Sequence, residues 1–246
     1  MNPAPPSFES LPLPAGFSLA RDHQGRLCLF DSREGAAGPL CVDFLAGASG
    51  WRLRDLGRSD LLPRAVGLKS ARPPRTLLDA TAGLGHDAAS LALLGLEVTA
   101  LEVSPVVFAL LQDGLARASA SGQELGRRLA QRLTPRCAEA RAFLRLSAAE
   151  RGITPDVVYL DPMFPDKRKA ARSRKEMQHL QGLLPPPSAA ELSELMTLAL
   201  GAAAQRVVVK RPLHAPEIVE NPPPSHSHKG KSVRFDVYLV TSARPR

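Results

Sequence analysis

Hydrophobic runs alternate with amphipathic stretches along most of the chain after residue 75. Short runs of β-favouring apolar residues predict strands, and stretches with apolar side chains every three or four positions predict helices. The pattern predicts strands near 76–80, 97–101, 132–136, 156–160, 206–210 and 233–241. It predicts helices near 86–95, 105–119, 122–130, 138–146 and 188–203. This alternation favours an α/β fold with a doubly wound sheet that binds its ligand at the carboxyl ends of the strands.

The first 60 residues follow a different pattern. Short β-like pieces at 17–19, 27–30 and 40–44 are separated by glycines and charged turns. We therefore expect a small β-rich N-terminal lobe and connection at 1–60, followed by the main domain at 61–246. Residues 52–67 are interpreted as a polar connection. The segment around His226 and His228 is rich in proline and serine and is interpreted as a surface loop.

Length and charge narrow the class of protein. The chain has 246 residues with 44% hydrophobic content, enough for one large core. Its net charge of +8 favours a polyanionic partner. No apolar run reaches the length of about 18 residues that a membrane span needs, and the amino terminus lacks a secretory pattern. We expect a soluble cytoplasmic protein, and the sequence does not indicate its oligomeric state.

The cysteines and histidines give no ligand pattern. Cys28, Cys41 and Cys137 form neither a CxxC pair nor an even framework, so we expect reduced thiols without a disulfide or zinc. The histidines are not spaced like metal ligands, and no metal is expected.

A strand, a glycine turn and a helix start follow one another in LLDATAGLGHD at 77–87. Gly83 and Gly85 let the backbone turn sharply and approach a ligand closely. Glu102 ends the next predicted strand, near the spacing of about 20 residues at which an acidic side chain meets a ribose diol. The same spacing satisfies the loose dinucleotide fingerprint, so an NAD-dependent dehydrogenase is the alternative.

Charge separates these two ligands. A dinucleotide places its pyrophosphate at the N-terminus of the first helix. Asp79 and Asp87 flank the glycines and would repel a pyrophosphate, although Asp87 also favours the helix start with either ligand. Two carboxylates suit a ligand that carries an ammonium and a sulfonium, and S-adenosylmethionine is therefore favoured over NAD.

A second motif, DPMFP at 161–165, follows the apolar run 157–160. An exocyclic base amine has a delocalised lone pair, so an enzyme that modifies it needs acceptors for its N–H groups. Asp161 and the carbonyl of Pro162 supply such acceptors. Phe164 or Met163 supplies a surface for stacking on the base. An ordinary Asp-Pro turn is the alternative interpretation.

Shortly after this motif, the nine residues 167–175 include six cations, namely Lys167, Arg168, Lys169, Arg172, Arg174 and Lys175. A charge run is usually a solvated surface. Its position beside the base-binding turn favours contact with the phosphates that flank the target base. Further cations could extend this surface: Lys210, Arg211, Lys229, Lys231 and Arg234.

Taken together, the motifs resemble one known family. Five blocks occur in that family's order, and they are DATAGLGHD at 79–87, LEVSPVVFALLQDGLARA at 101–118, YLDPMFPDKRKAARSRKEMQ at 159–178, RVVVKRP at 206–212 and GKSVRFDVY at 230–238. They closely resemble the ribosomal RNA small subunit methyltransferase J family. The resemblance implies a Rossmann-like class I methyltransferase that moves a methyl group from S-adenosylmethionine to the exocyclic N2 of a guanine in 16S ribosomal RNA.

The resemblance also implies roles for individual residues. Asp79, Gly83 and Gly85 are expected to wrap the methionine part of the donor. Further donor contacts are expected at His86, Asp87, Glu102, Val103, Glu139, Ala140 and Asp161. Val103 and the pair at 139–140 depart from the family pattern, so their contacts are expected to involve the backbone only. The alternatives are an amino-methyltransferase acting on DNA adenine or cytosine, and a non-catalytic RNA-binding protein of ribosome assembly.

Overall fold

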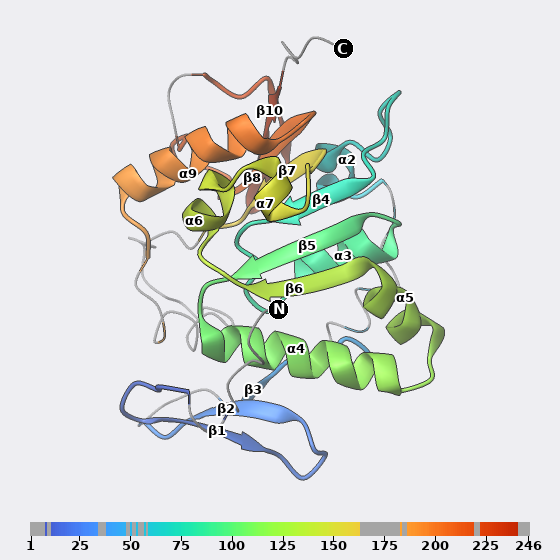
Figure 1. Cartoon of the computed structure of the whole chain (residues 1–246), viewed down its shortest axis with the longest axis vertical. Coiled ribbons are helices and arrows are strands. Elements are labelled where there is room, and N and C mark those ends of the chain that lie inside the picture. The colour runs from blue at the N-terminus through green and yellow to red at the C-terminus, as the bar shows by residue number, and fades with distance from the viewer. Residues whose placement is uncertain are drawn as a thin grey trace.

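The computed structural model of the protein describes residues 8, 11–33, 38–47, 50, 53, 57, 59–162, 183, 186–218 and 222–240. A seven-stranded sheet forms its centre, in the order β6-β5-β4-β7-β8-β10-β9 (Figure 1). The strands are β4 Thr76–Asp79, β5 Glu97–Glu102, β6 Leu133–Cys137, β7 Val157–Leu160, β8 Arg206–Pro212, β9 His226–Lys229 and β10 Val233–Leu239. The first five of these pair in parallel, while β10 is antiparallel to β8 and β9.

The strand order reverses beside β4. The chain passes from β4 outward through β5 to β6, and then returns to the other side of β4 with β7 and β8. Ligands of doubly wound sheets bind outside the carboxyl ends of the strands at such a reversal. Asp79 ends β4, and Asp161 follows β7 directly. The topology therefore brings both predicted motifs to one edge of the sheet.

Helices cover both faces of this sheet. The described helices are α2 Leu61–Val66, α3 His86–Leu93, α4 Pro105–Ala120, α5 Glu124–Arg132, α6 Ala140–Arg145, α7 Ala148–Arg151 and α9 Ala189–Ala202. Apolar residues of α2 to α5 share one hydrophobic cluster with Leu77 and Tyr159. Those of α6 and α9 share another with Leu78 and Val158. Because neighbouring strand residues face opposite layers, β7 is buried along its whole length.

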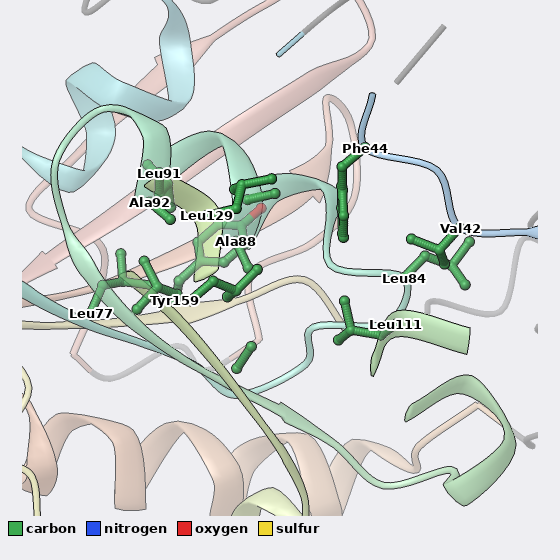
Figure 2. Close-up of a cluster of buried hydrophobic side chains, with 14 of the residues drawn as sticks. Val42, Phe44, Leu77, Leu84, Ala88, Leu91, Ala92, Leu111, Leu129 and Tyr159 are labelled. Carbon is green, nitrogen blue, oxygen red and sulfur yellow. The ribbon is translucent and has the colours of Figure 1, made fainter. Parts of the chain in front are cut away.

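The N-terminal residues form a separate three-stranded antiparallel sheet, in the order β1-β2-β3. Its strands are β1 Phe17–Arg21, β2 Leu27–Asp31 and β3 Leu40–Cys41. α4 lies between this sheet and the large one (Figure 1). Val42 and Phe44 pack into the same cluster as Leu84 and Leu111 (Figure 2). The predicted β-rich lobe is confirmed as a sheet, and the domain boundary at residue 60 stays a prediction.

Most elements of the large sheet agree with the sequence pattern. Each strand and helix predicted after residue 75 is present, and its ends shift by at most two residues. Two predictions are wrong. α2 forms within the expected polar connection, because Leu62, Ala65 and Val66 give that short segment a buried side. β9 forms where a loop was expected, because its backbone pairs with β10 even though the strand contains no large apolar residue.

The expectation of reduced thiols is wrong for two cysteines. Cys28 of β2 and Cys41 of β3 form a disulfide, and their Cα atoms lie 4.5 Å apart. The two residues are direct partners in the antiparallel pairing of these strands. Sequence spacing could not reveal this pairing, since the two cysteines are 13 residues apart. Cys137 is a free thiol. None of the helices in the described residues has the length and apolar character needed to cross a membrane.

Candidate active site

The glycine turn leads from the end of β4 into α3. Gly83 and Gly85 have φ angles of 54° and 76°, in the left-handed region. A Cβ atom on Gly85 would lie 2.5 Å from Cδ1 of Leu111 in α4. Gly85 is also the N-cap residue of α3, and no side chain caps this helix. The turn therefore needs glycine both for its backbone conformation and for its packing, and it brings the start of α3 to the edge of the sheet.

Asp79 is a buried carboxyl group at the base of this turn. Only 1% of the residue is exposed, and its Oδ1 accepts a hydrogen bond of 3.1 Å from the backbone N–H of Thr81. Burial raises the pKa of Asp79 well above its usual range, and the nearby carboxylates of Asp87 and Asp161 raise it further. Asp79 thus retains its proton to a higher pH than an exposed aspartate.

Glu102 connects the end of β5 to the glycine turn. Its Oε2 accepts a hydrogen bond from the N–H of Gly83 at 2.9 Å, and its Oε1 accepts one from the N–H of Ser104 at 2.7 Å. Burial raises the pKa of this carboxyl group, although these hydrogen bonds oppose the shift. The carboxylate keeps further acceptor capacity, which a hydroxyl group of a ligand could use.

Four side chains converge beside the turn. The Nζ atom of Lys210 lies 2.9 Å from Oδ2 of Asp87 and 2.7 Å from Oδ2 of Asp161. The hydroxyl of Tyr159 donates a hydrogen bond to Oδ2 of Asp87 at 2.7 Å. Side chains from α3, β7 and β8, with Asp161 just beyond β7, thus form one connected cluster. We call Asp87, Tyr159, Asp161 and Lys210 the lysine cluster.

The backbone adds a second connection between the two motifs. The N–H of Asp161 donates a hydrogen bond of 2.6 Å to Oγ1 of Thr81 in the glycine turn. The N–H of Ala80 donates one of 3.0 Å to the carbonyl of Tyr159. These bonds hold the start of the Asp-Pro motif against the glycine turn, although the two motifs are about 80 residues apart in the sequence.

The charges of the lysine cluster depend on one another. Burial alone would raise the pKa of Asp87, but the charge of Lys210 and the hydrogen bond from Tyr159 lower it below the usual value. The pKa of Asp161 is raised, because its burial and the charge of Asp87 outweigh the opposing effect of Lys210. Burial and the neighbouring carboxylates raise the pKa of Tyr159 well above its usual value, so its hydroxyl remains a donor.

The other predicted donor residues lie along the same edge. Val103 is 49% exposed and lines a cavity of about 400 Å³. The other residues lining this cavity are Pro12, Leu13, Pro14, Ser104, Pro105, Val106 and Leu183. Glu139 caps α6 with its carboxylate, which accepts from the N–H groups of Arg141 and Ala142, and Ala140 begins that helix. The Glu139 carboxylate is therefore already used within the fold.

Two predicted phosphate contacts need correction. Arg211 is 4% exposed, and its guanidinium donates a hydrogen bond to the carbonyl of Pro216. Arg234 is 8% exposed and forms an ion pair of 2.9 Å with Asp236. Neither buried guanidinium is presented to a phosphate. Lys229 and Lys231 are exposed.

The structure adds residues that the sequence did not single out for the site. Tyr159 was not predicted to belong to the site, and Lys210 was expected on a phosphate-binding surface. Their positions follow from the pairing of β7 with β8, which the sequence pattern alone does not specify. Pro162 is buried directly after Asp161. Met163, Phe164 and the six cations at 167–175 lie outside the described residues.

Comparison with known proteins identifies the family. A family model described as "Putative SAM-dependent methyltransferase" matches residues 14–240. A ribosomal RNA small subunit methyltransferase J of Aeromonas hydrophila is 47% identical over 218 residues, which cover 88% of this chain and 84% of the relative. The protein of the same name from Marinobacter nauticus is 42% identical over 226 residues, covering 92% of this chain and 78% of the relative.

Solved structures agree with this similarity. The crystal structure of a SAM-dependent methyltransferase from Neisseria gonorrhoeae is 33% identical, with a TM-score of 0.71, and the match covers 96% of this chain and 87% of that one. The rRNA methyltransferase AviRa of Streptomyces viridochromogenes shares the fold, with a TM-score of 0.52 at 19% identity. The chain therefore belongs to the ribosomal RNA small subunit methyltransferase J family, and its methyl donor is S-adenosylmethionine.

Proposed function

We propose that this protein methylates the exocyclic N2 of a specific guanosine in 16S ribosomal RNA of the small ribosomal subunit. The names of its relatives support small-subunit ribosomal RNA as the substrate. One structural observation supports an amine acceptor: the Asp161 carboxylate lies against the glycine turn and is joined through Lys210 to Asp87 at the start of α3. The acceptor motif and the donor motif thus meet at a single position.

The residues of the sheet edge fit S-adenosylmethionine. The two left-handed glycines allow close approach of the backbone, and the surrounding carboxyl groups suit a ligand with an ammonium and a sulfonium. Glu102 has acceptor positions for ribose hydroxyls. We assign the donor contacts to Asp79, Gly83, Gly85, His86, Asp87, Glu102, Val103, Glu139, Ala140 and Asp161. Because Glu139 already caps α6, it would act there mainly through its backbone.

Asp161 would act on the acceptor amine. When bound, S-adenosylmethionine supplies a methyl group whose bonding electron pair stays on sulfur as the acceptor nitrogen takes the carbon. Asp161 and the carbonyl of Pro162 would orient that nitrogen by accepting its N–H groups, and Phe164 would stack on the base. The amine becomes strongly acidic only after transfer, so no strong base is needed beforehand. Asp161 or water would then accept the excess proton.

The charge run after this turn is the proposed RNA contact. Lys167, Arg168, Lys169, Arg172, Arg174 and Lys175 follow the acceptor motif directly in the sequence. An ammonium or guanidinium placed on a phosphate releases condensed counterions, which makes binding favourable and dependent on salt. Exposed Lys229 and Lys231 could extend the contact, whereas buried Arg211 and Arg234 are excluded from this proposal.

Replacing Asp161 tests this function. The variant Asp161→Ala removes the proposed N–H acceptor, so methyl transfer to small-subunit RNA should fall by at least about 100-fold. Single turnover with labelled donor measures the loss, and calorimetry checks that donor still binds. Glu97→Ala is the control, because it removes an exposed carboxylate at the opposite, amino end of β5. Near-normal turnover of purified Asp161→Ala would refute the assignment.

A further inference from the structure

Lys210 lies inside the candidate active site because of strand register. In the parallel pairing of β7 and β8, Leu160 is the partner of Val209. The next residues along the two strands, Asp161 and Lys210, are therefore level with each other at the carboxyl edge. The side chain of Lys210 is 26% exposed, and its ammonium contacts two carboxylates. This placement differs from that of a surface lysine that contacts a phosphate.

Several ionisable groups face Asp161 from the surrounding elements. Within the described residues they are Lys210 on β8, Asp87 on α3, Tyr159 on β7 and Asp79 on β4. His86, next to Asp87, adds a weaker influence on the Asp87 carboxylate. Lys210 is the cation in this group that forms ion pairs with the acids. Without it, the carboxylates of Asp87 and Asp161 would repel each other in a partly buried site.

The two oxygens of Asp161 have different surroundings. Oδ2 lies 2.7 Å from the ammonium of Lys210. Among the described residues, no group donates a hydrogen bond to Oδ1. An aspartate held by one oxygen has a restricted orientation, and its other oxygen is left for a ligand.

We propose that Lys210 is a positioning residue for methyl transfer, which holds Oδ2 of Asp161 so that this side chain stays ionised and offers Oδ1 to an N–H of the acceptor amine. The inference rests on the proposed function of Asp161. It assigns Lys210 to the geometry of the reaction and not to the RNA backbone. Restricting the orientation of an active-site group lowers the entropic cost of reaching the reactive arrangement.

Lys210 itself does not act as a base. Burial would lower the pKa of its ammonium, but the charges of Asp87 and Asp161 raise the pKa above the usual value. The lysine therefore stays protonated at neutral pH. After methyl transfer the excess proton of the amine moves to Asp161 or to water, while Lys210 keeps its own protons.

The direct test follows the carboxyl group of Asp161 in the full-length protein without RNA. Aspartate labelled with ¹³C at the carboxyl group is titrated by NMR in the wild type, Lys210→Met and Lys210→Arg, and the Asp161 signal is identified by its loss in Asp161→Asn. Removing a cation at this distance should raise the titration midpoint of Asp161 by about one pH unit or more. Lys210→Arg should stay near the wild type. The control Lys69→Met removes an exposed lysine that lies shortly after α2, and it should cause no shift.

Single-turnover kinetics provide the second readout. In Lys210→Met the acidic limb of the pH–rate profile should move to higher pH, and Lys210→Arg should restore most of the rate. RNA affinity and its salt dependence should be unchanged. A lysine that binds a phosphate would behave differently. Its loss would weaken RNA binding and would reduce the slope of log affinity against log salt concentration by about one, while the acidic limb of the pH–rate profile would not move.

The outcomes separate the two hypotheses. An unchanged Asp161 titration in folded Lys210→Met, or an unchanged acidic limb, would overturn the role of Lys210. Thermal unfolding establishes that the variants are folded. A shifted Asp161 titration together with no methylation of RNA by the wild type would instead refute the proposed function. The proposal is supported if Lys210→Met shifts both the Asp161 titration and the acidic limb of the pH–rate profile, while Lys210→Arg shifts neither.

Discussion

Gly85 shows how a single residue serves both the backbone and the packing of the site. Its φ of 76° lies in the left-handed region, and a Cβ at this position would meet a side-chain methyl of Leu111 at 2.5 Å. Gly152 has a similar φ of 70°, but a Cβ there would meet no atom within 4 Å. Substituting either glycine would therefore cause similar backbone strain, but only at Gly85 would the new side chain collide with a neighbour.

This difference predicts different stabilities for two alanine variants. Gly152→Ala should cost about 1 kcal/mol, because alanine is strained in the left-handed region. Gly85→Ala should cost about 1–3 kcal/mol more, because the added methyl must displace Leu111 in the core. Urea unfolding of both variants measures the difference in the free energy of unfolding. Equal destabilisation of the two variants would contradict the packing argument.

Individual residues also show what the sequence could and could not predict about the site. The glycine turn was predictable, because it rests on local chemistry within a few residues. The role of Lys210 was not, because its neighbours Asp87 and Asp161 are 123 and 49 residues away in the chain. In the sequence it appeared as one more cation beside Arg211. The donor, acceptor and phosphate roles of the site residues stay predictions.

At the level of elements, α4 connects the two sheets through a buried carboxylate. Asp113 accepts hydrogen bonds from Nε of Arg117 at 2.7 Å, from Nη1 of Arg21 at 2.9 Å and from the backbone N–H of Leu27 at 3.1 Å. Its side chain is 8% exposed. Burial opposes ionisation of this group, but the hydrogen bonds from Arg117, Arg21 and Leu27 outweigh burial and lower the pKa of Asp113. The ionised carboxylate therefore stabilises the contact of α4 with β1 and β2.

This contact predicts a pH-dependent loss of stability. A carboxyl group with a lowered folded pKa stabilises the protein above its unfolded pKa of about 4, and this contribution disappears as the pH falls through the folded pKa. Asp113→Asn should therefore lower the free energy of unfolding by about 1–3 kcal/mol at pH 7. The difference in the free energy of unfolding between this variant and the wild type should become smaller toward pH 3. Urea unfolding at several pH values measures both effects.

An exposed pair on the neighbouring helix provides the control. Glu124 and Arg127 of α5 form a surface ion pair, and their side chains are 68% and 60% exposed. Glu124→Gln should change the stability by less than about 1 kcal/mol at any pH, because solvent screens such pairs. The role assigned to Asp113 would be contradicted if Asp113→Asn lost equally little stability. It would also be contradicted if the loss of stability did not decrease in acid.

The elements that the sequence pattern missed share a physical cause. β9 and α2 are short, and tertiary contacts stabilise them more than their own periodicity does. β9 is an edge strand whose pairing with β10 uses backbone groups that every residue carries. The Cys28–Cys41 disulfide likewise depends on the pairing of β2 with β3. By contrast, β5 and α4 combine clear apolar patterns with substantial burial, and their predicted positions were confirmed.

At the scale of the whole molecule, the reversal of strand order concentrates the chemistry on one edge. Side chains from α3, β5, β7 and β8 meet the glycine turn there, although they come from distant parts of the sequence. The net charge of +8 suits an RNA partner. Carboxyl groups gather at the same edge, where we propose that the methyl donor binds. Under the proposed function, the donor and the RNA would therefore contact different side chains of opposite charge.

Mapping the methylated nucleoside tests the proposed function directly. Small ribosomal subunits from a strain that lacks the enzyme would be incubated with the protein and labelled S-adenosylmethionine, and the modified nucleoside would be identified and located by mass spectrometry. The expected product is N2-methylguanosine at one position of 16S ribosomal RNA. A different methylated nucleoside, or methylation of DNA in place of this RNA, would contradict it.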